Sequence, residues 1–251
     1  MKFRLQAFGL HLSGSAIALT LVLGAFWLGW YRWPGWYLAG VLHVAGILVL
    51  VDLVLGPTLT LIVANPGKPR TELARDISII VAVQLIALVY GSLTLWGGRP
   101  LYYAFSADRL QLVQASDLRP DDIAVARHEN PALAPFWHSR PRWIWAPLPE
   151  SPEEALRIAN EALTGGPDVI QVPRYFRPWE QGLPELRKHL QKLDEMPYFS
   201  PAEKRTLKSR LAQLGLPVDQ ANAMVLWGGS RRVLAVFDSR TLAVRALLEP
   251  N

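Results

Sequence analysis

Three long apolar runs near the N-terminus constrain what this chain can fold into. They cover about residues 8–31, 36–64 and 77–96, and no comparable run follows Trp96 in the 251-residue chain. A helix needs about 20 apolar residues to cross about 30 Å of hydrocarbon. Each run is long enough, so the sequence predicts a membrane α-helical bundle of three transmembrane helices over residues 1–97.

The first run has one feature of a signal peptide, because Lys2 and Arg4 precede it. However, its apolar stretch is longer than the apolar core of a signal peptide. Residues 30–34, Trp-Tyr-Arg-Trp-Pro, also lack the small side chains of a cleavage site. We therefore expect this run to be retained as a transmembrane helix.

The basic residues predict the orientation of the helices, because cytoplasmic loops carry an excess of Lys and Arg. Basic residues gather before the first run and between the second and third runs, at Lys2, Arg4, Lys68, Arg70 and Arg75. The loop 31–35 holds one basic residue among aromatic residues. We expect a bacterial inner-membrane protein with a cytoplasmic N-terminus, and with Trp30, Trp33 and Trp36 at the outer interface. Residues 98–251 are then periplasmic.

Residues 98–251 have the pattern of a soluble α+β domain, with strands near both ends and helices in the middle. Alternating or short apolar runs predict strands, and Ser-Pro starts predict two of the helices. The expected strands cover residues 101–105, 110–114, 223–227, 233–237 and 243–247. The expected helices cover about residues 151–163, 183–195 and 200–214, after an irregular Pro-rich excursion over residues 115–150.

Polar residues within the apolar runs are the candidate site. Asp52 lies near the middle of the second run, where an ionisable group is costly and is a functional candidate by default. Gln84 and Tyr90 on the third run reach similar depths, so we expect them to be its partners. Gly56 and Pro57 follow, and Pro57 predicts a kink. Two interpretations stay open, namely a hydrogen-bonded aspartate that holds the helices together and a group that binds a partner.

The sequence offers no support for catalysis, a cofactor or nucleic-acid binding. It has no cysteine, which excludes thiolate chemistry and cysteine metal sites. His128 and His138 are ten residues apart in Pro-rich sequence and match no metal motif. The net charge is +5, but acids are interleaved with the bases and no Lys/Arg stripe stands beside stacking aromatic residues. We expect a protein that is not an enzyme and has no cofactor.

Three segments carry a resemblance to a known family. Residues 51–61, Val-Asp-Leu-Val-Leu-Gly-Pro-Thr-Leu-Thr-Leu, resemble the signature of the type IV pilin accessory proteins of the TfpX/TfpZ type. Residues 4–12 resemble the N-terminal Arg-x-x-Ala-Phe-x-x-His-Leu stretch of that family, and residues 98–109 resemble its motif after the third helix. The matching positions of that last motif include Arg99, Pro100, Tyr102, Phe105, Asp108 and Arg109.

The resemblance covers about the first 115 residues and implies an inner-membrane, chaperone-like helper of type IV pilus assembly. Its implied partner is a major type IV pilin, which is held in the membrane by one apolar helix below a periplasmic head. The remaining residues match no family motif, so no pilin-binding residue is transferred there. The alternative is a membrane-anchored periplasmic binding or sensor protein of unknown ligand. The oligomeric state and the pilin that is served stay open.

Overall fold

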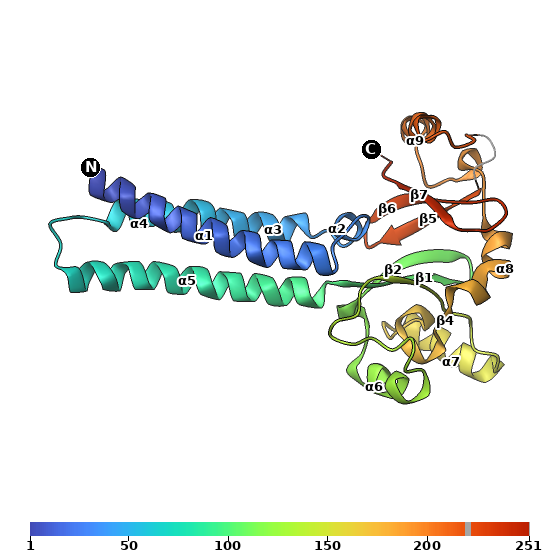
Figure 1. Cartoon of the computed structure of the whole chain (residues 1–251). Helices are drawn as coiled ribbons and strands as arrows, with labels where there is room; N and C mark the ends of the chain where they lie inside the picture. The colour runs from blue at the N-terminus through green and yellow to red at the C-terminus, as the bar shows by residue number, and fades with distance from the viewer. Residues whose placement is uncertain (219–221, 251) are drawn as a thin grey trace. The chain divides into compact units, whose positions relative to one another are not determined.

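The computed structural model describes residues 1–218 and 222–250, which form two compact units (Figure 1). The first unit comprises Met1–Arg32 and Gly40–Gly98. The second comprises Trp33–Ala39 and the residues from Arg99 onward. Three long apolar helices therefore precede an α+β domain, which confirms this part of the predicted fold class.

The first unit consists of three helical rods. α1 spans Lys2–Gly29 and α5 spans Arg70–Gly97. The middle rod, Leu42–Val63, joins α3 (Leu42–Val49), the π-helix η1 (Leu50–Leu55) and α4 (Gly56–Val63). All three rods are long and apolar enough to cross a membrane, and most of their apolar side chains face outward rather than into the unit. A helix that is apolar all round suits a lipid environment.

The middle rod begins later than the apolar run from residue 36 suggested. The short helix α2, Gly35–Leu38, is separate from it, and Gly40 between them has a φ of +68°. This left-handed conformation is easy for glycine and interrupts a helix. α1 and α5 extend beyond the expected runs 8–31 and 77–96 mainly at their polar N-terminal ends, because a helix continues past its apolar stretch.

Trp33–Ala39, which contains two of the tryptophans expected at a membrane interface, packs within the second unit. Leu38 is buried in the core of this unit, and the Trp33 indole N–H donates to the Leu247 carbonyl at 2.9 Å. Arg231 donates to the Tyr37 carbonyl at 3.1 Å. The segment between two apolar helices is therefore part of the α+β domain.

The second unit is built on a seven-stranded mixed sheet in the order β4-β3-β1-β2-β5-β6-β7. The strand bounds are β1 Pro100–Ser106, β2 Arg109–Gln114, β3 Arg142–Trp145, β4 Arg177–Pro178, β5 Asn222–Gly228, β6 Arg231–Phe237 and β7 Val244–Leu248. β1 pairs with β3, and β2 with β5, in parallel, and the remaining pairs are antiparallel. The first hairpin and the C-terminal meander are as predicted.

Both faces of the sheet are covered, so its central strands carry apolar side chains on both sides. Tyr103 and Phe105 of β1 belong to a cluster that includes Leu186 of α8, whereas Tyr102 and Ala104 belong to the opposite face. The helices are α6 Pro120–Glu129, α7 Pro152–Leu163, α8 Trp179–His189 and α9 Pro201–Gln213. Short 3₁₀ turns occupy Ala115–Asp117, Val169–Gln171, Pro173–Tyr175 and Leu193–Glu195.

Two expectations for this unit were wrong. The excursion 115–150 contains α6 and β3, and β3 takes its place only by parallel pairing with β1. The helix expected over residues 183–195 begins at Trp179 and ends at His189, with Pro184 inside it rather than at its start. By contrast, Ser200 caps α9 with the expected capping box, in which the Ser200 and Glu203 side chains each accept from the other's backbone N–H.

Candidate functional site

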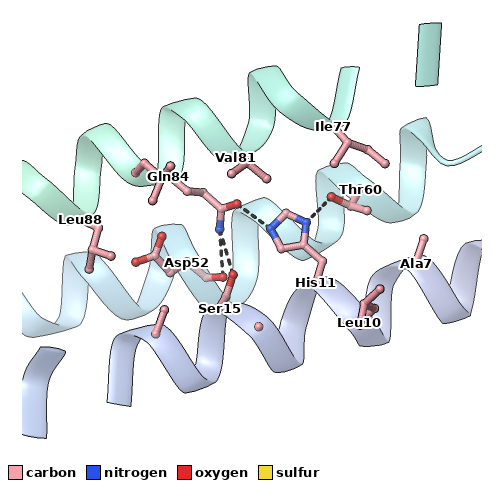
Figure 2. Close-up of a pocket in the computed structure, with 13 residues that line it drawn as sticks. Ala7, Leu10, His11, Ser15, Asp52, Thr60, Ile77, Val81, Gln84 and Leu88 are labelled. Carbon is pink, nitrogen blue, oxygen red and sulfur yellow. Dashed lines mark hydrogen bonds between the residues drawn. The ribbon is translucent and has the colours of Figure 1, made fainter. Parts of the chain in front are cut away.

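A cavity of about 410 Å³ lies within the first unit (Figure 2). It is bounded by side chains of α1 and α5, with Asp52 of η1 and Thr60 of α4 between them. Its lining is mainly apolar, but it contains a small set of polar side chains: His11, Ser15, Asp52, Thr60 and Gln84. In apolar surroundings a polar group without a hydrogen-bond partner is costly.

The π-helix leaves one backbone carbonyl, that of Asp52, without a backbone hydrogen-bond donor. Gly56 N–H bonds to the Val51 carbonyl, five residues back. The next bond in this register would run from residue 57 to the Asp52 carbonyl, but Pro57 has no N–H. The Gln84 side-chain amide takes its place and donates to the Asp52 carbonyl at 3.1 Å. Gln84 therefore compensates for a backbone hydrogen bond that Pro57 removes.

Gly56 gives Gln84 the room to reach that carbonyl. A Cβ placed on Gly56 would overlap the Gln84 amide group, since its nitrogen, carbon and oxygen all come too close. Gly56, Pro57 and Gln84 are all buried. The glycine thus permits the crossing of α5 over the middle rod at the point where the proline requires it.

His11 extends the network to α1. Its Nε2 lies 2.6 Å from Gln84 Oε1, and its Nδ1 lies 2.5 Å from Thr60 Oγ1. Because Gln84 already uses its NH₂ as a donor to a carbonyl, its Oε1 faces His11 as an acceptor. His11 Nε2 must then carry a proton, and in neutral histidine Nδ1 accepts from the Thr60 hydroxyl. Each of the three rods contributes at least one side chain to this chain of bonds (Figure 2).

The carboxylate of Asp52 is the incompletely satisfied member of the site. Asp52 is 5% exposed and lines the cavity. Its Oδ2 has no hydrogen-bond partner among residues 1–218 and 222–250. An unpaired acid at the centre of a membrane helix costs about 2.5–3.5 kcal/mol on insertion scales. The cavity therefore contains a buried acceptor whose partner is not supplied by the described part of the chain.

The structure separates the residues that the sequence grouped with Asp52. Gln84 contacts Asp52 by donating to the Asp52 backbone carbonyl. Pro57 leaves that carbonyl without a backbone donor, and Gly56 leaves room for the Gln84 side chain. Tyr90 is 74% exposed and does not line the cavity, so its expected partnership with Asp52 was wrong. It lies six residues after Gln84 on α5, about 120° away in azimuth. Similar positions along the two rods did not place Asp52 and Tyr90 on facing helix surfaces.

His11, Ser15 and Thr60 were not recognised as members of this site. His11 lies in the N-terminal segment 4–12 and Thr60 in the segment 51–61, both of which carry the family resemblance. A histidine and a threonine on apolar helices were thus the available signals. Neither signal indicated which helix faces would meet.

The motif after the third helix serves the packing of the second unit. Tyr102 and Phe105 are fully buried, and the Tyr102 hydroxyl donates to the Leu133 carbonyl at 2.7 Å. Burial raises the pKa of Tyr102, which keeps this hydroxyl a donor. Arg109 pairs with Asp168, and Asp108 lies exposed in the turn between β1 and β2. Arg99 is 9% exposed, and Pro100 begins β1.

The two histidines of the Pro-rich segment stand apart from this core. His128 is exposed in the last turn of α6, and His138 is exposed and contacts the rings of Phe136 and Trp137. Within residues 1–218 and 222–250, no three His, Asp or Glu side chains are grouped as metal ligands.

The second unit also has a cavity of about 580 Å³ beside α7, lined by Glu154, Tyr175 and Arg177 among others.

Comparison with known proteins gives three relatives. The chain is 24% identical over 220 residues to the fimbrial assembly protein of serogroup I from Dichelobacter nodosus, covering 87% of this chain and 84% of the relative. The serogroup E1 protein of the same organism gives the same identity and coverage. The protein of serogroups C1 and C2 is 28% identical over 124 residues, which is 49% of this chain and 95% of the relative. No protein-family model and no solved structure matches the chain. The chain is thus similar, over most of its length, to proteins named for fimbrial assembly.

Proposed function

We propose that this protein is an inner-membrane accessory protein that assists type IV pilin stability or pilus assembly. The similarity to fimbrial assembly proteins over 87% of the chain carries this proposal. It extends through both units, so it is not a general likeness between apolar helices. The resemblance of residues 4–12, 51–61 and 98–109 to type IV pilin accessory proteins supports the same role.

The two units suit a helper of a pilin, which has an apolar helix and a periplasmic head. The helical unit provides three apolar rods for the membrane, and the second unit provides a folded domain for the head. In this proposal the protein acts by binding and not by catalysis. Single replacements of His128 and His138 by Ala should then leave pilus assembly intact at normal protein level.

The proposed orientation places the N-terminus and the loop around Arg70 in the cytoplasm, and the second unit in the periplasm. A periplasm-active reporter fused after Asn251 should be active, and the same reporter fused after Arg70 should be inactive. The opposite pattern would reverse the orientation and would remove the second unit from the compartment of the pilin head.

The role itself is tested by deleting the gene in its own host and restoring it. The deletion should reduce surface pili and the steady-state level of the major pilin, and the wild-type chain should restore both. Pilin captured by in vivo crosslinking to the wild-type chain would identify the partner directly. Unchanged pili in the deletion, together with no captured pilin, would favour the alternative of a membrane-anchored binding or sensor protein.

A further inference from the structure

The cavity within the helical unit is lined unequally by the two outer helices. On α1 its lining includes the small residues Ala7, Gly14, Ser15 and Ala18. On α5 it includes the larger side chains Val81, Leu85 and Leu88. Small residues allow the backbone of another helix to approach closely, which is how helices associate within membranes. The α1 side therefore offers close packing, and the α5 side offers apolar side chains.

Asp52 gives this cavity a chemical preference. Asp52 is 5% exposed and lines the cavity, and its Oδ2 has no partner in the described residues (Figure 2). The hydrogen bonds of the neighbouring groups go elsewhere. Gln84 donates to the Asp52 carbonyl and lies 3.5 Å from Ser15 Oγ, and His11 is bonded to Gln84 and Thr60. Oδ2 still lacks a donor among the described residues, and a cationic or hydroxyl group of another molecule would supply one.

We propose that this cavity is the docking site for the apolar helix of a type IV pilin subunit, and that Asp52 accepts a hydrogen bond from a donor on that helix. This inference rests on the proposed function. The pilin helix lies along the opening between α1 and α5 and places side chains into the cavity. The volume of about 410 Å³ accommodates side chains rather than a whole helix.

The polar network has a distinct part in this arrangement. The bonds among His11, Thr60 and Gln84 hold the three rods together, and Gln84 fixes the Asp52 backbone. The aspartate is thereby held in place before its partner arrives, which reduces the ordering cost of binding. A lipid chain fits the apolar lining but brings no donor to the carboxylate. Donor chemistry therefore favours a protein helix over an acyl chain.

The absence of native cysteine makes a site-specific test direct. A single cysteine replaces Leu85, which lines the cavity and is 55% exposed, or Val83, which does not line it and is 58% exposed. The two positions are nearly equal in depth and exposure but lie on different faces of α5. In whole cells whose major pilin carries one cysteine, scanned along its apolar helix, L85C should crosslink to the pilin and V83C should not.

Asp52 is tested in the same assay by Asp52→Leu and Asp52→Asn at matched protein level. A hydrogen bond to a charged group contributes about 1.5–3 kcal/mol, so Asp52→Leu should reduce pilin crosslinking through L85C by about tenfold or more. Asp52→Asn keeps an acceptor oxygen and should retain part of the capture. Equal capture by wild type and Asp52→Leu would overturn the recognition by Asp52. The asparagine variant provides the same test if the leucine variant fails to accumulate.

A photo-crosslinking residue at the exposed Trp137 of the second unit separates the two proposals. Pilin captured from Trp137 but not from L85C would overturn the docking site and leave the proposed function standing. Capture of a second copy of this chain at L85C, in place of pilin, would also overturn it. Pilin captured from neither position, with normal pili in the deletion strain, would overturn both proposals.

Discussion

The two units use polar side chains in different ways. In the helical unit a few polar groups are concentrated in one network, and one carboxylate oxygen lacks a partner among the described residues. In the α+β unit, charged and polar side chains mostly form pairs and caps at the surface, around an apolar core that covers both faces of the sheet. In apolar surroundings a polar group is costly enough to indicate a specific task, whereas at a wet surface it is ordinary.

The same contrast separates the family-like segments. The segment 51–61 contributes Asp52, Gly56, Pro57 and Thr60 to a polar site in a cavity. The segment 98–109 contributes Tyr102 and Phe105 to a packed core. A resemblance to a family therefore does not by itself distinguish a binding site from a folding requirement. The following substitutions test this distinction, from the largest expected effect to the smallest.

Phe105→Ala should have the largest effect on the second unit. Removing a fully buried ring leaves a cavity between the sheet and α8, and such changes cost about 3–5 kcal/mol of unfolding free energy. The measurement is thermal unfolding of the full chain in detergent, followed by proteolysis of the second unit. Asp108→Ala, in the exposed turn of the same motif, is the control and should change stability by less than about 0.5 kcal/mol. Equal effects of the two variants would contradict a core role for the motif.

Gln84→Leu should destabilise the helical unit, because it leaves the Asp52 carbonyl and His11 Nε2 without their partner. An unsatisfied buried group costs about 1–3 kcal/mol. The measurement is unfolding of the helical unit in a bilayer-like medium. Pilin capture is recorded in parallel.

Pro57→Ala provides the matched test of this explanation, because alanine restores an N–H that can reach back to the Asp52 carbonyl. Gln84→Leu should then cost less in the Pro57→Ala background than in the wild type. The difference is a coupling energy of about 0.6–1.7 kcal/mol, the range found for polar contacts between membrane helices. Strict additivity would show that Gln84 does not compensate for the proline.

Gly56→Ala should destabilise the same unit through steric overlap with the Gln84 amide. Overpacking of this kind costs about 1–3 kcal/mol, and relaxation of the Gln84 side chain reduces it. Gly46→Ala, on the same rod, meets no atom within 4 Å and is the control. The control should be neutral or slightly stabilising, because alanine favours a helix more than glycine does. Loss of stability in both variants would indicate a general intolerance of this rod.

Asp238 should produce the smallest effect, visible as a pH dependence of the second unit. Hydrogen bonds from the Thr241 backbone, the Arg245 side chain and the Arg240 backbone hold its pKa well below the usual range. Its stabilisation is therefore present above the unfolded pKa of about 4 and is lost as the pH falls through the folded pKa.

Asp238→Asn should flatten the dependence of the melting temperature on pH below about pH 4. Near neutral pH, the slope of melting temperature against pH should change little. The comparison is with the wild type under the same buffer conditions. If the melting temperatures of wild type and Asp238→Asn fall equally as the pH is lowered, other groups control the loss of stability in acid.

Much of the architecture follows from the sequence, because it depends on local pattern. The lengths of the apolar runs define three helical rods, and alternation defines the first hairpin and the C-terminal meander. Ser200 and Glu203 specify the start of α9 through contacts only three residues apart. Depth along a rod is also a local property, so the sequence could place Asp52 and Gln84 at similar levels.

Only the tertiary structure decided which side chains meet. His11 joins Thr60 and Gln84 across separations of 49 and 73 residues, while Tyr90 faces away. Trp33–Ala39 packs with the sheet, and β3 pairs in parallel with β1, through contacts that are also distant in the chain. Helix azimuth and strand pairing depend on such non-local packing, and apolar length and periodicity contain no information about it.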